Sequence, residues 1–309
     1  MEWWHAVILG LVEGITEYLP ISSTGHLILA SAALGLDDPE VKDAVDAFNI
    51  VIQGGAILAV LGLYRERVIQ MCKGLLGVVK LGPGDPVGLK LATNIIVAFL
   101  PAAVLGVLFN DWIEEKLFAP GPVLLALGLG GVYMIALDRW RMKRLRTEGD
   151  DQAADLASLT PLRALVIGLL QCIAMWPGTS RSMMTITGGV LVGLKPKDAA
   201  EFSFLLGLPT LGGACVYSLY KNLSESAEAG TPNLFDQLGW TAVLLGVAVA
   251  TASAVVAVRW LVSFLNKHGL EGFGWYRLAL CVVVGAAVWM GWIEIGDVPG
   301  TGSDAGAIE

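Results

Sequence analysis

Residues 9–29 read LGLVEGITEYLPISSTGHLIL, a segment that carries acids, hydroxyls and a histidine within an otherwise apolar run. Residues 169–189, LLQCIAMWPGTSRSMMTITGG, repeat the plan with an arginine at the break. Each apolar arm has about 10–15 residues, too few to cross a bilayer but enough to reach its middle. Polar backbone at that depth is tolerated where protein buries it or water reaches it. We therefore expect two re-entrant helical hairpins, over 3–36 and 163–194.

The composition is that of a membrane protein. Of the 309 residues, 55% are hydrophobic and 16% are charged, against about 25% charged in a soluble domain. The mean hydropathy is +0.67. These values exclude a soluble enzyme and a disordered chain, and the net charge of −8 argues against a nucleic-acid surface. The four cysteines lie far apart and three histidines are present, which predicts neither a disulfide framework nor a multi-histidine metal site.

Six other runs are long and apolar enough to span a bilayer as helices. They lie near 48–64, 91–110, 121–138, 202–220, 239–260 and 275–293. Each half of the chain therefore has one hairpin followed by three spans. Because three is odd, the second half must lie upside down, which predicts an all-α polytopic membrane protein with an inverted-topology repeat. The expected division is a first repeat at 1–138, a cytoplasmic linker at 139–162, a second repeat at 163–293 and an outer-side tail at 294–309.

Two further features bear on this layout. The hairpins align weakly, Gly10 with Gly168 and, after a one-residue gap, Ser23 with Ser180.

Most of the 20 Lys and Arg residues fall in loops that this topology places on one side, and Arg277 is counted among them. The positive-inside rule makes that side cytoplasmic. Both termini then face outward, and the second hairpin enters from the cytoplasm.

Four ionisable side chains lie at hairpin depth, where burial of a charge is costly and indicates function. They are Glu13, Glu17, His26 and Arg181. Glu13 and Glu17 are four residues apart and share a helix face, so their charges repel each other unless a cation lies between them. Arg181 or a divalent metal ion would supply that cation.

The breaks in the two hairpins predict a phosphate site. The free amides at the start of each second half-helix bind anions, and the Arg181 guanidinium can fork onto phosphate oxygens. A hydroxyl, an imidazole and a carboxylate close together are the parts of a nucleophile with its base. Both PISSTGH (20–26) and PGTSRS (177–182) supply hydroxyls where one half-helix gives way to the next.

At these residues the chain resembles the undecaprenyl-diphosphate phosphatase family, also called UppP or BacA. FNIVIQGGAILAV (48–60) and EFSFLLGLP (201–209) match as well, so the resemblance covers nearly the whole chain. It implies a membrane phosphatase that cleaves the terminal phosphate of the C55 isoprenoid diphosphate, giving the monophosphate carrier lipid for peptidoglycan synthesis. It also implies dependence on a divalent cation, Mg²⁺ or Ca²⁺, and a site that opens to the outer face of the bacterial cytoplasmic membrane. Met183–Met184 depart from the pattern, where smaller residues are expected, and could narrow the loop or cost one phosphate hydrogen bond.

We assign catalysis to Ser23, His26, Glu17 and Arg181, and metal binding to Glu13 and Glu17. Phosphate binding falls to the other hydroxyls of the two breaks: Ser22, Thr24, Thr179, Ser180, Ser182 and Thr185. In this hypothesis Ser23 attacks the terminal phosphorus and Glu17 or His26 takes its proton. The sequence leaves His26 open as the alternative nucleophile.

The competing function is a transporter or flippase of a prenyl-phosphate lipid, because inverted repeats with broken helices are typical of transporters. The acid, hydroxyl and arginine cluster favours chemistry, since transport of an anion needs no pair of glutamates. The expected partners are the prenyl diphosphate substrate and membrane lipids, with no nucleic acid. A homodimer is left open.

Overall fold

The computed structural model describes residues 1–36, 39–117, 120–148 and 154–290. Its regular elements are helices, together with a 3-10 turn at Leu156–Ser158. The first half holds α1 (Trp3–Thr16), α2 (Ser23–Ala33), α3 (Pro39–Leu63), α4 (Arg65–Val78), α5 (Pro86–Leu117) and α6 (Pro120–Glu148). The second half holds α7 (Pro161–Ile173), α8 (Arg181–Leu191), α9 (Pro196–Ala229), α10 (Leu234–Leu238), α11 (Trp240–Leu265) and α12 (Glu271–Trp289).

Six of these helices are long and apolar enough to cross a membrane, which confirms the predicted number of spans. Five helices begin with proline, whose fixed φ suits a helix and whose missing amide would be unpaired there in any case. The span candidates are Ala44–Leu63, Pro86–Phe109, Gly121–Lys143, Pro196–Ala229, Trp240–Leu265 and Glu271–Trp289.

Some boundaries differ from expectation. Helix α4 occupies part of 65–90, which was expected to be a loop, and it pairs closely with the start of α5. A Cβ at Gly74 would collide with the backbone of Leu89, so small residues bring the two helices together. Helix α6 continues through Glu148 into the expected linker. The rest of the linker up to 153 and the expected tail at 294–309 lie outside the described residues.

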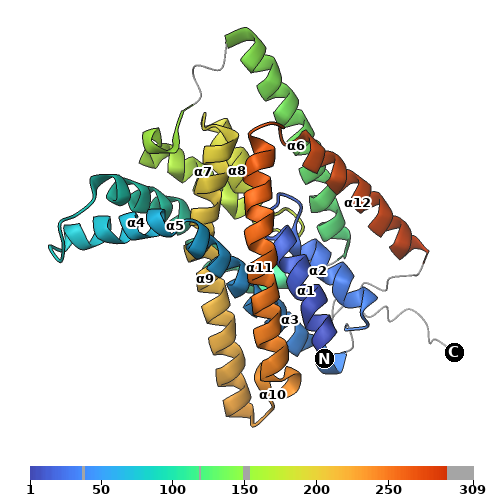
Figure 1. The fold of residues 1–309 in the computed structure, drawn as a ribbon. Helices are drawn as coiled ribbons and strands as arrows, with labels where there is room; N and C mark the ends of the chain where they lie inside the picture. The colour runs from blue at the N-terminus through green and yellow to red at the C-terminus, as the bar shows by residue number, and fades with distance from the viewer. Residues whose placement is uncertain (37–38, 118–119, 149–153, 291–309) are drawn as a thin grey trace.

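Two pairs of short helices lie where the hairpins were expected. Residues 17–22 separate α1 from α2, and residues 174–180 separate α7 from α8. At about 1.5 Å per residue these helices are roughly 16–21 Å long, against about 30 Å of hydrocarbon core. The two pairs lie in opposite halves of the view, with their loops facing each other (Figure 1). Entry and exit of each hairpin on one side of a membrane stays a prediction.

The first arm of each hairpin packs against a helix of the other half. Helix α1 lies along α11, where Gly14 is so close to Ala250 and Ser253 that a Cβ would collide. Helix α7 lies along α5, where Gly168 meets the backbone of Ala98 in the same way. Each half therefore completes the packing of the other's hairpin. The inverted orientation of the two halves stays a prediction.

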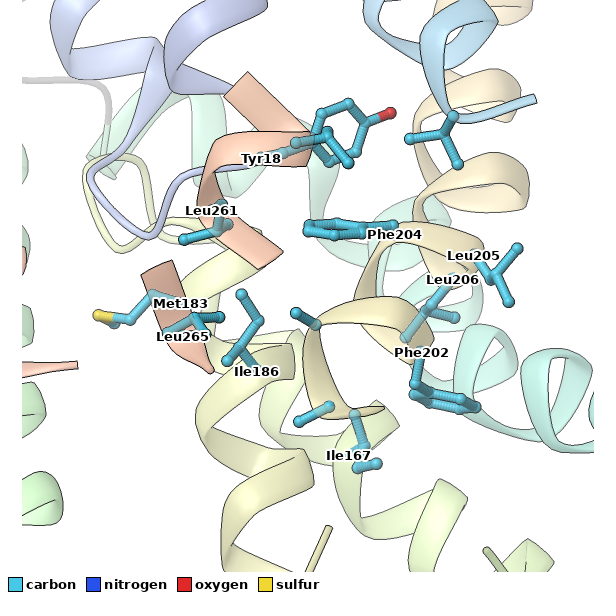
Figure 2. Close-up of a cluster of buried hydrophobic side chains, with 14 of the residues drawn as sticks. Tyr18, Ile167, Met183, Ile186, Phe202, Phe204, Leu205, Leu206, Leu261 and Leu265 are labelled. Carbon is cyan, nitrogen blue, oxygen red and sulfur yellow. The ribbon is translucent and has the colours of Figure 1, made fainter. Parts of the chain in front are cut away.

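The largest cluster of buried apolar side chains lies beside the hairpin loops. Helices α8, α9 and α11 contribute Met183, Phe204 and Leu261 among others (Figure 2). Tyr18, in the first loop, joins the cluster with its ring edge-on to Phe204 at a centroid distance of 5.3 Å. Its hydroxyl donates to the carbonyl of Ala56 at 3.0 Å. This packing fixes the first loop at Tyr18, the residue that directly follows Glu17.

Candidate active site

Both hairpin loops end in the same backbone turn. Ser22 has φ 75° and Ser180 has φ 78°, values that residues other than glycine rarely adopt. Each side chain caps the helix that follows, Ser22 Oγ accepting from the Gly25 amide and Ser180 Oγ from the Met183 amide. Strained backbone of this kind clusters at functional sites.

A cavity of about 110 Å³ lies between the two loops. Both hairpins line it, and the starts of α2 and α8 are part of that lining, so two helix N-termini favour an anion there. Spans α3 and α9 each add one residue. The lining consists of Glu17, Ser22, Ser23, Thr24, Gln53, Ala174, Pro177, Gly178, Ser180, Arg181 and Leu211.

Ser23, Glu17 and Arg181 meet at one side of this cavity. The Ser23 hydroxyl donates to Glu17 Oε2 at 2.6 Å, and Arg181 Nη2 donates to Glu17 Oε1 at 2.9 Å. The Glu17 and Arg181 side chains are 5% and 10% exposed. At such burial the ion pair is little screened, so Glu17 stays oriented toward Ser23. The structure thus brings together three of the four residues to which catalysis was assigned.

The Arg181 guanidinium is fixed from several directions and still has a free donor. Nη1 donates to the carbonyl of Ser203 at 3.0 Å, and the charge lies 5.6 Å from the centre of the Tyr18 ring. Gly207 makes room for it, because a Cβ there would lie 2.9 Å from Nη1. Nε is buried and has no hydrogen-bond partner among the residues that the structure describes. A buried, unpartnered donor on a residue that lines the cavity is suited to a phosphate oxygen.

His26 lies one turn into α2, and both of its ring nitrogens have partners other than Ser23. Nδ1 donates to the carbonyl of Ser22 at 2.7 Å, and Nε2 lies 2.7 Å from the hydroxyl oxygen of Tyr276 on α12. The two rings also stack, with an interplanar angle of 4°. His26 does not belong to the cavity lining. It is therefore held beside the site by Tyr276, in the geometry shown.

Glu13 lies one turn before Glu17 and is fully buried. Within the described part of the chain, no donor group satisfies either of its carboxylate oxygens. Among the described residues no group of three or more acidic, histidine or cysteine side chains is placed to hold a metal. Mg²⁺, however, is commonly bound by one or two carboxylates together with substrate phosphates. Glu13 does not line the cavity, but its free acceptors lie one helical turn from Glu17, which does, and together the two carboxylates fit such a shared cation.

The remaining predicted phosphate ligands divide into two groups. Ser22, Thr24 and Ser180 line the cavity. The others are buried behind it: Ser182 donates to the carbonyl of Leu19 at 2.8 Å, and the Thr185 and Ser203 hydroxyls lie 2.6 Å apart. Thr179 is also buried and outside the lining. The contacts of Ser182 and Thr185 tie the start of α8 to the first loop and to α9.

The two methionines that depart from the family pattern do not enter the cavity. Met183 is 1% exposed and Met184 is 5% exposed, and both belong to the apolar core (Figure 2 labels Met183). They therefore point from α8 into the apolar core, and neither lines the cavity. Because both positions face the core, a smaller polar residue at either one would not reach a phosphate in the cavity.

Arg277 is the clear correction to the sequence analysis. It was counted with the basic residues of the connection between the last two spans, but it lies within α12 and is 0% exposed. Its guanidinium donates to backbone carbonyls of both hairpin loops and of α6. Hydropathy could not reveal this, because the carbonyls that solvate the charge come from distant segments.

Other site residues were missed or undervalued. Gln53, inside the apolar run of α3, lines the cavity, and a polar side chain at that depth was the signal for it. Ser203 lies within EFSFLLGLP, and it holds Arg181 through its backbone carbonyl, which no side-chain pattern can predict. Tyr276 gave no signal, since tyrosine is common near the ends of spans.

The family model described as bacitracin resistance protein BacA matches residues 6–283. The chain belongs to the BacA family. Among the curated BacA relatives, the undecaprenyl-diphosphatase of Sorangium cellulosum is 45% identical over 284 residues, covering 92% of this chain and 86% of the relative. Undecaprenyl-diphosphatase 2 of Rhodospirillum rubrum is 45% identical over 289 residues, with 94% and 96% covered. The undecaprenyl-diphosphatase of Polaromonas sp. is 42% identical over 287 residues, with 93% and 95% covered.

Proposed function

We propose that this multi-pass membrane protein hydrolyses undecaprenyl diphosphate to undecaprenyl phosphate and inorganic phosphate, recycling the carrier lipid for cell-wall synthesis. The observation that carries the proposal is the Ser23–Glu17–Arg181 arrangement at a cavity whose lining includes the starts of two helices. A hydroxyl on a carboxylate, beside an arginine with a free donor, is equipped for phosphoryl transfer. Membership of the BacA family and the names of its relatives support the same substrate.

In the first step Ser23 attacks the terminal phosphorus. The new bond is from Ser23 Oγ to phosphorus, and the bond from phosphorus to the bridging oxygen breaks, so the prenyl monophosphate leaves. Glu17 Oε2, 2.6 Å from the Ser23 hydroxyl, accepts its proton. Negative charge is concentrated on the equatorial oxygens of the transferred phosphoryl group, and Arg181 donates to one of them through its free Nε.

In the second step water replaces the serine on phosphorus. Glu17, which now carries the proton, returns it to Ser23 Oγ as that oxygen leaves, and the water proton passes to Glu17 and then to solvent. Inorganic phosphate is released, and the resting Ser23–Glu17 hydrogen bond is restored. One carboxylate therefore acts first as base and then as acid, as microscopic reversibility requires.

The geometry favours Ser23 over His26 as the nucleophile. The Ser23 hydroxyl lies on a carboxylate at the cavity, whereas the His26 nitrogens are engaged by Ser22 and Tyr276. Turnover quenched with denaturant at neutral pH, where both phosphoserine and phosphohistidine persist, followed by mass spectrometry decides between them. Phosphate on Ser23 supports the proposal, and phosphate on His26 transfers the nucleophilic role to the histidine.

Glu13 and Glu17 would hold the divalent cation that the family resemblance implies. When bound there, such an ion would supply positive charge to offset the negative charge of the phosphates. The support is the pair of unsatisfied Glu13 oxygens next to Glu17. The roles of Ser23, Glu17 and Arg181 described above belong to this chain's own groups.

We also propose the membrane setting. The basic loops favour an orientation with both termini outside the bacterial cytoplasmic membrane and the site open to the outer side. The apolar span candidates support a prenyl tail that lies in lipid beside the cavity. The names of the BacA relatives favour hydrolysis over a flippase.

Phosphate release from the C55 lipid by purified protein in detergent tests the proposed function. The wild type is compared with Glu17→Ala, with and without a chelator. Release that needs both the divalent cation and Glu17 supports the proposal. Wild-type protein that binds the lipid and releases no phosphate overturns it and favours transport.

A further inference from the structure

A single buried arginine contacts both hairpin loops. Arg277 Nη2 donates to the carbonyl of Gly178 at 2.8 Å, and Nη1 lies 3.5 Å from the carbonyl of Pro20. Nε and Nη2 also donate to the carbonyls of Leu127 and Ala126 on α6, each at 3.2 Å. One side chain on α12 therefore joins the first loop, the second loop and α6.

The two loop carbonyls occupy matching positions. Pro20 lies three residues before Ser23, the first residue of α2, and Gly178 lies three residues before Arg181, the first residue of α8. In each loop, Arg277 therefore contacts the carbonyl that lies three residues before the side chain that the loop brings to Glu17. A change in either contact would displace Ser23 relative to Arg181.

The surroundings of Arg277 show that this arrangement is specific. A fully buried cation is costly, and well-packed apolar residues are often at least as stable in its place. The acceptors that the structure gives its guanidinium are backbone carbonyls, so dipoles solvate the charge. Gly130 on α6 makes room, because a Cβ there would collide with the guanidinium.

We propose that Arg277 is the positioning residue that holds the two hairpin loops in register, so that Ser23 and Arg181 meet on the Glu17 carboxylate. The inference rests on the proposed function, since its consequence is read in the hydrolytic rate. A lysine retains the charge but has a point-like ammonium, which cannot reproduce the planar fork of contacts.

Hydrogen exchange of the purified protein tests the contact without any substrate. Arg277→Lys and Arg277→Gln are compared with Arg259→Lys and Arg259→Gln, at an exposed arginine on α11. We expect amides in 18–23 and in 177–182 to exchange faster together in the Arg277 variants and to be unchanged in the controls. Faster exchange in one loop alone, or in neither, overturns the proposal.

Kinetics then test the consequence for catalysis. A loop displaced by about 1 Å costs on the order of 10²-fold in rate, so Arg277→Lys should lower kcat by about that factor with a smaller change in KM. Combined with Arg181→Lys, its effect should be less than multiplicative, because both changes misplace the same contact. Multiplicative effects, or a fall in thermal stability with kcat retained, indicate a structural role and contradict the proposal.

Gly130→Ala provides a variant in which Arg277 is retained. Its added Cβ should displace the guanidinium and reproduce faster exchange in both loops, whereas Gly128→Ala, with ordinary contacts at Cys281, should not. A Gly130→Ala protein with unchanged exchange and unchanged kcat overturns the proposal even if the Arg277 variants fail to fold. If the wild type itself releases no phosphate, the proposed function fails, while the exchange result still decides whether Arg277 holds the loops.

Discussion

Ser23 and Arg181 contact opposite oxygens of one carboxylate, that of Glu17, at 2.6 Å and 2.9 Å. Each is the first residue of the second helix in its hairpin. The two hairpins therefore deliver a nucleophile and a cation from matching positions to a shared acid. This relation requires both loops at once, so a change in either hairpin should impair the same chemical step.

Removal of the nucleophile is the first prediction. Ser23→Ala leaves Glu17 paired with Arg181 but without a hydroxyl to activate. We expect phosphate release to fall by about 10³-fold or more, because loss of the nucleophile also removes the contribution of its general base. Ser224→Ala, near the C-terminal end of α9, is the matched control and should retain wild-type kcat. A Ser23→Ala protein that retains most of its activity is incompatible with attack by Ser23.

The second prediction concerns the shape of the Arg181 cation. Arg181→Lys retains the charge but loses the donors that reach Glu17, Ser203 and the phosphate together. We expect kcat/KM to fall by about 10²-fold. Arg163→Lys, at an exposed position on α7, should behave as wild type. Equal activity of the two lysine variants would show that charge alone suffices.

Gly207 tests the space around that cation. Gly207→Ala places a Cβ about 2.9 Å from Arg181 Nη1 and 3.2 Å from its Cζ, so the guanidinium must shift. We expect kcat to fall by about 10-fold, because even a small displacement of the guanidinium from its catalytic position lowers the rate. Gly212→Ala lies on the same helix with open space around it and should be neutral. Parallel steady-state assays and thermal unfolding curves separate lost alignment from lost stability.

Tyr276 and His26 should act as one unit. Tyr276→Phe removes the hydroxyl that lies 2.7 Å from His26 Nε2 and retains the stacked ring. We expect kcat to fall by about 3–10-fold, the factor that corresponds to the net free energy of one typical hydrogen bond. The same substitution in a His26→Ala background should have little further effect. Independent effects of the two changes would show that Tyr276 does not work through His26.

Glu13 is predicted to govern the need for a divalent cation. Glu13→Gln removes a negative charge from the proposed cation ligands while preserving shape. We expect the Mg²⁺ concentration for half-maximal activity to rise by about 10-fold or more. Glu228→Gln, an exposed acid near the end of α9, is the control. An unchanged Mg²⁺ requirement for Glu13→Gln would remove Glu13 from the cation site.

The sequence predicts the helix breaks and the number of spans because both depend on local hydropathy and on residues such as Pro20 and Pro177. It predicts Glu17, Ser23 and Arg181 as site residues because charges and hydroxyls at that depth are costly. The weak alignment with a gap pairs Ser23 with Ser180. The structure instead shows Ser22 and Ser180 in the same left-handed turn, which makes Ser23 and Arg181 the matching pair. Backbone dihedrals, unlike side-chain identity, carry that correspondence.

The sequence could not predict what distant segments supply. In the sequence Arg277 looks like a basic residue that flanks a span. Its burial depends on carbonyls from three other parts of the chain, which accept its hydrogen bonds. Ser203 acts through its backbone, and α4 lacks the continuous apolar run that marks a span. Each of these features depends on tertiary contacts that no local pattern records.

Positional labelling of the substrate tests the central claim most directly. Purified protein is given a prenyl diphosphate labelled at the terminal phosphate, and a parallel sample labelled at the phosphate bonded to the prenyl chain. The account predicts that the terminal label appears as inorganic phosphate, the other label remains in the lipid monophosphate, and both results are lost in Ser23→Ala. Release of labelled diphosphate, or binding of the lipid with no release at all, would contradict it.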